Sequence, residues 1–289
     1  MAVAAPALAV EQQRRAGLPR VLVYWHLLSL DAPTVAVLWA WGFAHAARVP
    51  LPWIATAVLG LGAWIIYVAD RLLDGRTSDG RCEDLRERHF FHARHRRAFL
   101  VVGSCAGVAL LALIITAMAS APRRDDSAIF GLFLLYFLIV HLPGARIRFP
   151  RELAVGIIFA SACVAPAWSR PGSPHTELAA MAILFAALCW LNCTAIHVWE
   201  HDGPAYLIPI MALCVAAAAV ALAWAAGVAH SGACRLDLAT LASALLLLAL
   251  DRDHRRSLRG SAQPSTLALR VLADAALLTP LLFVVPWRI

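Results

Sequence analysis

The stretch that decides the fold is LPWIATAVLGLGAWIIYVADRLLDG, residues 51–75. Its first nineteen residues carry no charged side chain. A run of that length can cross the hydrocarbon core of a bilayer, about 30 Å thick, as a helix. The run ends abruptly in Asp70, Arg71 and Asp74. The stretch therefore predicts a membrane helix whose last turns carry two carboxylates at the membrane surface.

The composition of the whole chain indicates a polytopic membrane protein. Of its 289 residues, 61% are hydrophobic and only 15% are charged, and the mean hydropathy is +0.72. Soluble domains carry about 25% charged residues, so this composition excludes an ordinary soluble domain. Nine runs are predicted to span the membrane: 21–47, 51–69, 98–122, 128–145, 153–169, 178–199, 204–234, 236–250 and 271–287.

We expect an all-α fold in which about nine transmembrane helices form one bundle over residues 21–289. No long linker or convincing internal repeat divides this part of the sequence. Residues 1–20 are predicted to form a flexible cytoplasmic arm. The charges of EQQRR follow the apolar run MAVAAPALAV, whereas in a signal peptide they would precede it.

The arginines predict the orientation in the membrane. With nine spans, the N-terminus and the loops after every second span share one side, and this side holds 19 of the 25 arginines. The positive-inside rule then places the N-terminus in the cytoplasm and the C-terminus outside, in the inner (plasma) membrane. The net charge of +7 is explained by topology and by attraction to anionic lipid, so nucleic acid is not needed as a partner. No obligate protein partner is evident either.

Asp70 and Asp74 are the first candidate site. If the helix continues through both, their side chains project from one face about one turn apart. Two carboxylates at that spacing need a positive group between them, and paired carboxylates at a helix exit suit Mg²⁺, which takes oxygen ligands and completes its shell with substrate phosphates. The alternative is an interfacial turn with solvated charges, because DGRTSDG has the composition of a loop.

A second polar cluster is WLNCTAIHVWEHDG, residues 190–203. Asn192 and His197 fall inside the sixth predicted span, where polar groups are costly and usually face a cavity or a partner. Glu200, His201 and Asp202 follow at its cytoplasmic exit. By the predicted topology, this cluster and the Asp70 region emerge on the same side of the membrane.

Two further groups of side chains lie on that side. Arg146, Arg148 and Arg151 precede the fifth span and could hold an anion such as a diphosphate, although a plain positive-inside loop explains them almost as well. The stretch ERHFFHARHRR contains His89, His92 and His95. A straight helix does not direct three such histidines to one metal, so an amphipathic interfacial helix is the preferred interpretation.

These fragments together resemble the UbiA family of intramembrane prenyltransferases. ADRLLDG is similar to that family's first aspartate motif, N-D-x-x-D-x-x-x-D, at the cytoplasmic end of the second of nine helices. LDAPTVAVLWAWGFA, from Leu30, resembles its first-helix segment built on L-D-x-P, and FPRELAVGIIFA resembles the segment that opens helix five. NCTAIHVWEHDG falls where the second aspartate motif belongs. The likeness spans nearly the whole chain.

The sequence also departs from the family pattern. With Asp70 and Asp74 aligned, the leading asparagine and first aspartate of the motif become Ile66 and Tyr67. The second motif keeps its carboxylates at 200 and 202, but its upstream aspartates appear as Asn192 or His197. Fewer carboxylates imply weaker or fewer metal sites. A fold can be retained while its chemistry changes.

The resemblance implies Mg²⁺-dependent transfer of a prenyl group from an isoprenoid diphosphate to an aromatic or lipidic acceptor that the sequence does not identify. The diphosphate would enter from the membrane lipid, and its charge would be neutralised by metal and arginine. Aromatic faces would stabilise the allylic cation, and the candidates for this are Tyr67, Trp64, Tyr136 and Trp199. The implied catalytic residues are Asp70, Asp74 and Glu200, and Asp202 joins them as a metal ligand. The implied substrate contacts are Arg71, Tyr67, Tyr136, Arg146, Arg148, Asn192 and His197.

Three other functions remain open at the level of sequence. The chain could be a non-catalytic lipid-binding protein with the same fold. It could be a membrane metal oxidase of the histidine-box type, given eleven histidines, the His197-x-x-x-His201 spacing and the histidines between residues 89 and 95. It could also be a transporter, in which Asp31, Asp274 and His197 line a path, although no inverted repeat is recognisable.

Overall fold

The computed structural model describes residues 19–77, 87–118, 131, 151–201, 203–227, 232–258 and 265–284. All regular structure in these residues is helical. The elements are α2 (Arg20–Leu27), α3 (Asp31–Ala46), α4 (Trp53–Thr77), α5 (Glu87–Arg94), α6 (Arg96–Thr116), α8 (Arg151–Trp168), α9 (His175–Glu200), α10 (Leu207–Ala225), α11 (Gly232–Ser257), α12 (Thr266–Ala275), the 3-10 helix η1 (Ala276–Leu278) and α13 (Pro280–Phe283).

Seven helical segments in the described residues are long and apolar enough to cross a membrane. They correspond to seven of the nine predicted spans, and the last of them is formed by α12, η1 and α13 together. Apart from residue 131, the predicted span 128–145 lies outside the described residues. An all-helical membrane bundle is therefore supported, whereas the count of nine stays a prediction.

The first predicted span, 21–47, is not one continuous helix. It is divided into α2 and α3, whose axes differ in direction by 91°. The elbow between them is a compact turn, in which Leu28 N–H donates to Tyr24 O at 2.8 Å and Leu30 N–H donates to Trp25 O at 2.9 Å. Ser29 adopts φ 58°, in the left-handed region that few residues other than glycine enter. The backbone groups of the turn are thus satisfied locally.

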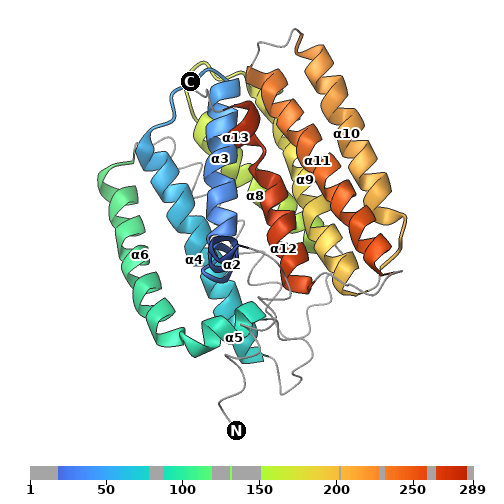
Figure 1. The fold of residues 1–289 in the computed structure, drawn as a ribbon. Coiled ribbons are helices and arrows are strands. Elements are labelled where there is room, and N and C mark those ends of the chain that lie inside the picture. Colours follow the sequence, from blue (N-terminus) through green and yellow to red (C-terminus); the bar gives the residue numbers. More distant parts are fainter. Residues whose placement is uncertain are drawn as a thin grey trace.

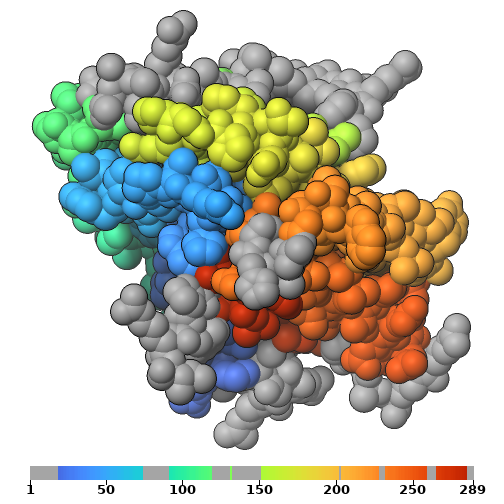
Figure 2. Space-filling model, turned by 90° about the horizontal axis from the view of Figure 1, so that it is seen from above, coloured from blue at the N-terminus to red at the C-terminus, as the bar shows by residue number. Residues whose placement is uncertain are grey.

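The long helices run side by side, and α12 lies among them (Figure 1). In the bundle α8 packs on α9, α10 packs on α11, and α3 contacts both α4 and α8. Seen from above in Figure 2, the red C-terminal segment lies between the blue and the orange segments, and green α6 is at the edge. Side chains of α6 such as Val108 and Ile115 are at least 60% exposed, as expected of a helix facing lipid.

The core joins α3, α9 and η1, which lie far apart in the sequence. Trp39 of α3 stacks on Phe185 of α9 with ring centroids 3.9 Å apart, and Phe43 meets Phe185 edge-on. The indole nitrogen of Trp39 donates to the carbonyl oxygen of Leu277 in η1 at 2.9 Å. A buried indole needs such an acceptor, and this one comes from the opposite end of the sequence.

Candidate functional site

Polar side chains from several predicted motifs lie at the same end of the bundle. The C-terminal ends of α4, α9 and α11 lie there together with the N-terminal end of α12 (Figure 1). The first turn of α8 lies at this end too, because its side chains come within 4.0 Å of side chains on α4 and in the last turn of α9. The two acidic motifs of the sequence therefore lie at the same end of the bundle.

Helix α4 continues through both positions of the first aspartate motif, since it extends to Thr77. Asp70 is partly exposed, and its Oδ1 lies 4.0 Å from Nη2 of Arg151 at the start of α8. Asp74 occupies the position one turn further along α4, and its side chain lies outside the described part of the structure. The helical spacing assumed for this pair is therefore present in the backbone.

The first turn of α8 also reaches the second motif. Glu152 Oε1 lies 3.8 Å from Nδ1 of His197 on α9. The His197 ring stacks on His201 with centroids 4.5 Å apart. The N-terminus of α8 is thus held between the α4 motif and the α9 motif, and the N-terminus of a helix favours anions.

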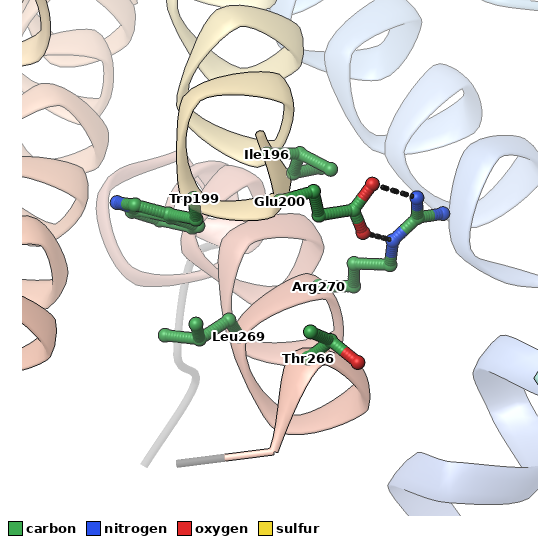
Figure 3. A pocket seen from close by; sticks show the side chains of 6 residues that line it. All are labelled: Ile196, Trp199, Glu200, Thr266, Leu269 and Arg270. Atoms are coloured by element: carbon green, nitrogen blue, oxygen red, sulfur yellow. Dashed lines mark hydrogen bonds and ion pairs between the residues drawn. The ribbon is translucent and has the colours of Figure 1, made fainter. Parts of the chain in front are cut away.

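Glu200, the central acid of the second motif, is engaged by Arg270 of α12. Arg270 Nε donates to Glu200 Oε1, and Arg270 Nη2 donates to Glu200 Oε2 at 2.5 Å. Both side chains are largely buried and are directly hydrogen-bonded to each other. They line a small surface hollow together with Ile196, Trp199, Thr266 and Leu269 (Figure 3). The hollow leaves no room even for a water molecule, whereas pockets for small molecules usually measure about 300–1,000 Å³. As it stands, this hollow does not accommodate an isoprenoid diphosphate.

Several predicted site residues lie outside the described residues: Tyr136, Arg146, Arg148 and Asp202. Their proposed contacts with metal and substrate stay predictions. His89 is placed only as part of the backbone of α5. His92 of the same helix is buried, lies 3.1 Å from Ser29 Oγ and stacks on Phe99 at 4.1 Å. His95 instead contacts the Phe91 carbonyl oxygen at 2.9 Å.

Arg71, Tyr67 and Asn192, all predicted substrate contacts, belong to a separate buried polar cluster. The Arg71 guanidinium donates to Ser29 Oγ and to the His26 carbonyl oxygen, the latter at 3.2 Å. It also lies over the Tyr67 ring, 5.7 Å from the centroid. Arg71 is only 3% exposed. Its donors are directed into the bundle, toward the elbow between α2 and α3.

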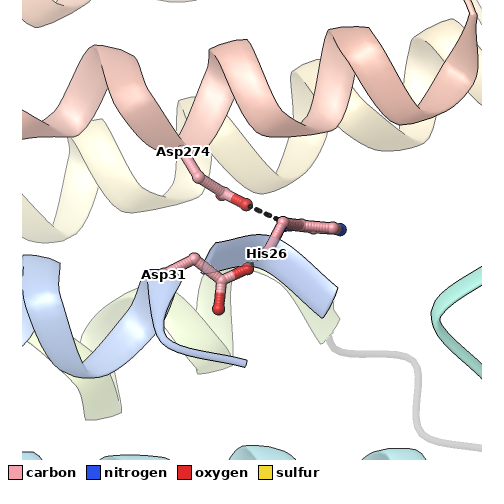
Figure 4. Close-up of side chains that lie close together, drawn as sticks. All are labelled: His26, Asp31 and Asp274. Atoms are coloured by element: carbon pink, nitrogen blue, oxygen red, sulfur yellow. Dashed lines mark ion pairs between the residues drawn. The ribbon is translucent and has the colours of Figure 1, made fainter. Parts of the chain in front are cut away.

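The centre of this cluster consists of His26, Asp31 and Asp274. His26 Nδ1 lies 2.8 Å from Asp31 Oδ2 and 3.3 Å from Asp274 Oδ2. Figure 4 shows the two carboxylates, one from α3 and one from α12, on either side of the histidine from α2. Arg71 Nη2 is 3.4 Å from Asp31 Oδ2, and Asn192 Nδ2 donates to Asp274 Oδ1 at 3.4 Å. The cluster therefore links α2, α3, α4, α9 and α12.

The sequence pattern identified only part of this cluster. Asp31 and Asp274 stood out as single acids inside apolar runs, which is the signal that marks a functional position in a membrane helix. His26 had no such signal, because it lies near the end of an apolar run among many other histidines. In the described residues this is the single group of three or more His, Cys, Asp or Glu side chains that could share a metal ion. The described histidines at 92, 95, 197 and 201 belong to no such group.

Comparison with known proteins identifies no family for this chain. No protein-family model matches its sequence, and no curated protein and no solved structure matches it either. The resemblance to UbiA prenyltransferases therefore rests on the sequence motifs alone.

Proposed function

We propose that the chain is an intramembrane prenyltransferase that uses an isoprenoid diphosphate and Mg²⁺. The observation that supports this best is the position of the first turn of α8. Arg151 lies next to Asp70 on α4, and Glu152 lies next to His197 on α9. Two motifs about 125 residues apart are thus attached to one helix N-terminus, which is the kind of position where a phosphate is bound.

Asp70 and Asp74 are the best candidates to hold the metal. Carboxylate oxygens one helical turn apart have the hardness and the spacing that suit Mg²⁺. Glu200 fits less well, because Arg270 engages both of its oxygens. It would be a ligand only if this ion pair opened. When bound, Mg²⁺ would neutralise charge on the diphosphate.

Residues of the chain itself would position the substrate. Arg151 is 56% exposed at its side chain and lies beside Asp70, so its guanidinium can face a diphosphate. Arg71 is less suited to this role, since its donors are directed toward Ser29, His26 and Asp31. In the reaction, the allylic C–O bond breaks and the diphosphate leaves with the electron pair. The acceptor then forms a bond to the allylic carbon and releases a proton.

The test is binding and turnover of prenyl diphosphates by the detergent-solubilised protein. Short- and long-chain prenyl diphosphates are added with Mg²⁺, and both affinity and pyrophosphate release are measured. We expect Asp70→Asn and Asp74→Asn to weaken binding by at least about tenfold, or about 1.4 kcal/mol. Asp253→Asn is the matched control, because Asp253 is an exposed acid near the end of α11. Unchanged affinity in both motif variants would remove the proposed headgroup site.

The same assay separates the alternatives. Pyrophosphate release that depends on Asp70 and Asp74 would favour a prenyltransferase over a non-catalytic lipid-binding protein. A histidine-box oxidase would instead contain tightly bound iron. His197 and His201 are stacked on each other, but among the described residues no three histidines form a group that could share a metal ion.

A further inference from the structure

The atoms at the centre of the buried cluster are arranged like ligands around one point. Nδ1 of His26 and one oxygen from each of Asp31 and Asp274 all lie within 4.8 Å of one another. The measured separations from Nδ1 are 2.8 and 3.3 Å. A four-coordinate ion with bonds of about 2.0–2.1 Å holds its ligand atoms about 3.3 Å apart. The spacing therefore leaves each of these atoms within reach of a common ion.

The other oxygen of each carboxylate is held by a different partner. Asp31 Oδ1 accepts from the backbone N–H of Ala32 at 2.9 Å. Asp274 Oδ1 accepts from Asn192 Nδ2 at 3.4 Å. Both Oδ2 atoms lie beside His26 Nδ1, and Asp31 Oδ2 also accepts from Arg71 Nη2 at 3.4 Å. Metal-binding carboxylates and histidines are commonly oriented by such outer hydrogen bonds.

His26 presents one ring nitrogen to both carboxylates. His26 is 1% exposed, yet within the described structure neither ring nitrogen has a hydrogen-bond partner of acceptable geometry. Nδ1 is within 3.3 Å of an oxygen from each carboxylate. In a metal site the ion, not the neighbouring ligand, lies along the nitrogen lone pair, so the other ligands are found off that axis. Asn192 Oδ1 is a second buried atom without a partner among the described residues.

We propose that His26, Asp31 and Asp274 bind one divalent transition-metal ion of the zinc or manganese type. One imidazole nitrogen with two carboxylate oxygens favours such an ion over Mg²⁺, which prefers oxygen ligands alone. Arg71 stays on the Asp31 side of the site and offsets part of the negative charge. This site is separate from the Asp70 and Asp74 pair and does not depend on prenyl transfer.

The experiment measures metal bound to the full-length protein, purified without a metal-affinity tag. The protein is stripped with a chelator, and binding of Zn²⁺, Mn²⁺ and Mg²⁺ is then titrated and checked by elemental analysis. We expect about one Zn²⁺ or Mn²⁺ per chain, and affinity at least about tenfold weaker in Asp274→Asn and Asp31→Asn. Asp253→Asn, at an exposed acid near the end of α11, is the control that should retain the metal. Absence of Zn²⁺ and Mn²⁺ from the wild type, or equal affinity in both cluster variants, would overturn the proposal.

A second readout covers the case in which the cluster variants do not fold. A metal that binds only the native state raises the temperature of unfolding. Chelator should therefore lower that temperature in the wild type, and Zn²⁺ or Mn²⁺ should restore it while Mg²⁺ should not. If neither Zn²⁺ nor Mn²⁺ changes the temperature of unfolding, the proposal is contradicted. A failed prenyl diphosphate assay would leave these results unaffected, so the two proposals are tested separately.

Discussion

At Gly156 two helices of the bundle touch backbone to backbone. A Cβ atom at this position of α8 would lie 2.8 Å from the carbonyl oxygen of Ala186 and 3.1 Å from the backbone nitrogen of Trp190, both on α9. Neither atom can rotate away as a side chain can. Small residues allow this close approach, on which helix packing in membranes depends.

We predict that Gly156→Ala destabilises the protein by about 1–3 kcal/mol, the usual cost of overpacking. Thermal unfolding in detergent measures this effect. Gly107→Ala on α6 is the matched control, because a Cβ there meets nothing within 4 Å. The control should be neutral or slightly stabilising, since alanine is the better helix former. Equal stability of the two variants would show that α8 and α9 are packed less closely than described.

At the scale of an element, Ser29 allows the backbone conformation of the elbow between α2 and α3 to be tested. Ser29 combines a left-handed backbone with a buried hydroxyl that contacts Arg71 and His92. Replacing it by alanine or by glycine removes the hydroxyl in both cases. Only glycine adopts φ 58° without steric cost.

The difference between these two variants isolates the backbone of the elbow. We expect Ser29→Ala to be less stable than Ser29→Gly by about 1 kcal/mol, the cost of a left-handed conformation with a Cβ. Unfolding of both variants should be followed under identical conditions. A more stable alanine variant would mean that the elbow is a continuous helix in the protein, as the apolar run 21–47 suggests.

The sequence predicted the helices better than the turns between them or the contacts of their side chains. Long uncharged runs predicted α4 and α9 correctly, because only a helix satisfies its own backbone in lipid. The elbow was missed although Pro33 lies in the first turn of α3, a position where proline marks the start of a helix. Arg71 was expected to face a diphosphate, yet its guanidinium lies in the interior beside Ser29. Periodicity shows which positions are polar, but not which helix lies opposite them.

The same limit applies to the candidate site. Asp70 and Glu200 were recognisable from their positions at the ends of apolar runs. The pairing of Glu200 with Arg270 was not, because it depends on how α12 is placed against α9. His26 and Asp274 are brought together only by tertiary packing between the two ends of the chain.

At the scale of the whole molecule, the arrangement of charges predicts the orientation in the membrane. Position 171, in the exposed turn between α8 and α9, should face the outside, and position 253 at the other end of the bundle should face the cytoplasm. Single cysteines at these positions can be labelled with a membrane-impermeant thiol reagent in intact bacterial cells. We expect labelling at 171 in intact cells and at 253 only after permeabilisation, with the parent protein as background. The reverse pattern would invert the proposed topology.

The link between the earliest and latest helices also bears on biosynthesis. His26 and Asp31 leave the ribosome long before Asp274, which lies in α12. Trp39 is likewise synthesised long before Leu277, whose carbonyl oxygen accepts its hydrogen bond. Until α12 and η1 are inserted, the nascent chain exposes an acid, a histidine and an indole that lack their final partners. Release from the insertion machinery is therefore expected to be late, and a chain truncated before residue 266 should be a preferred target of membrane proteases.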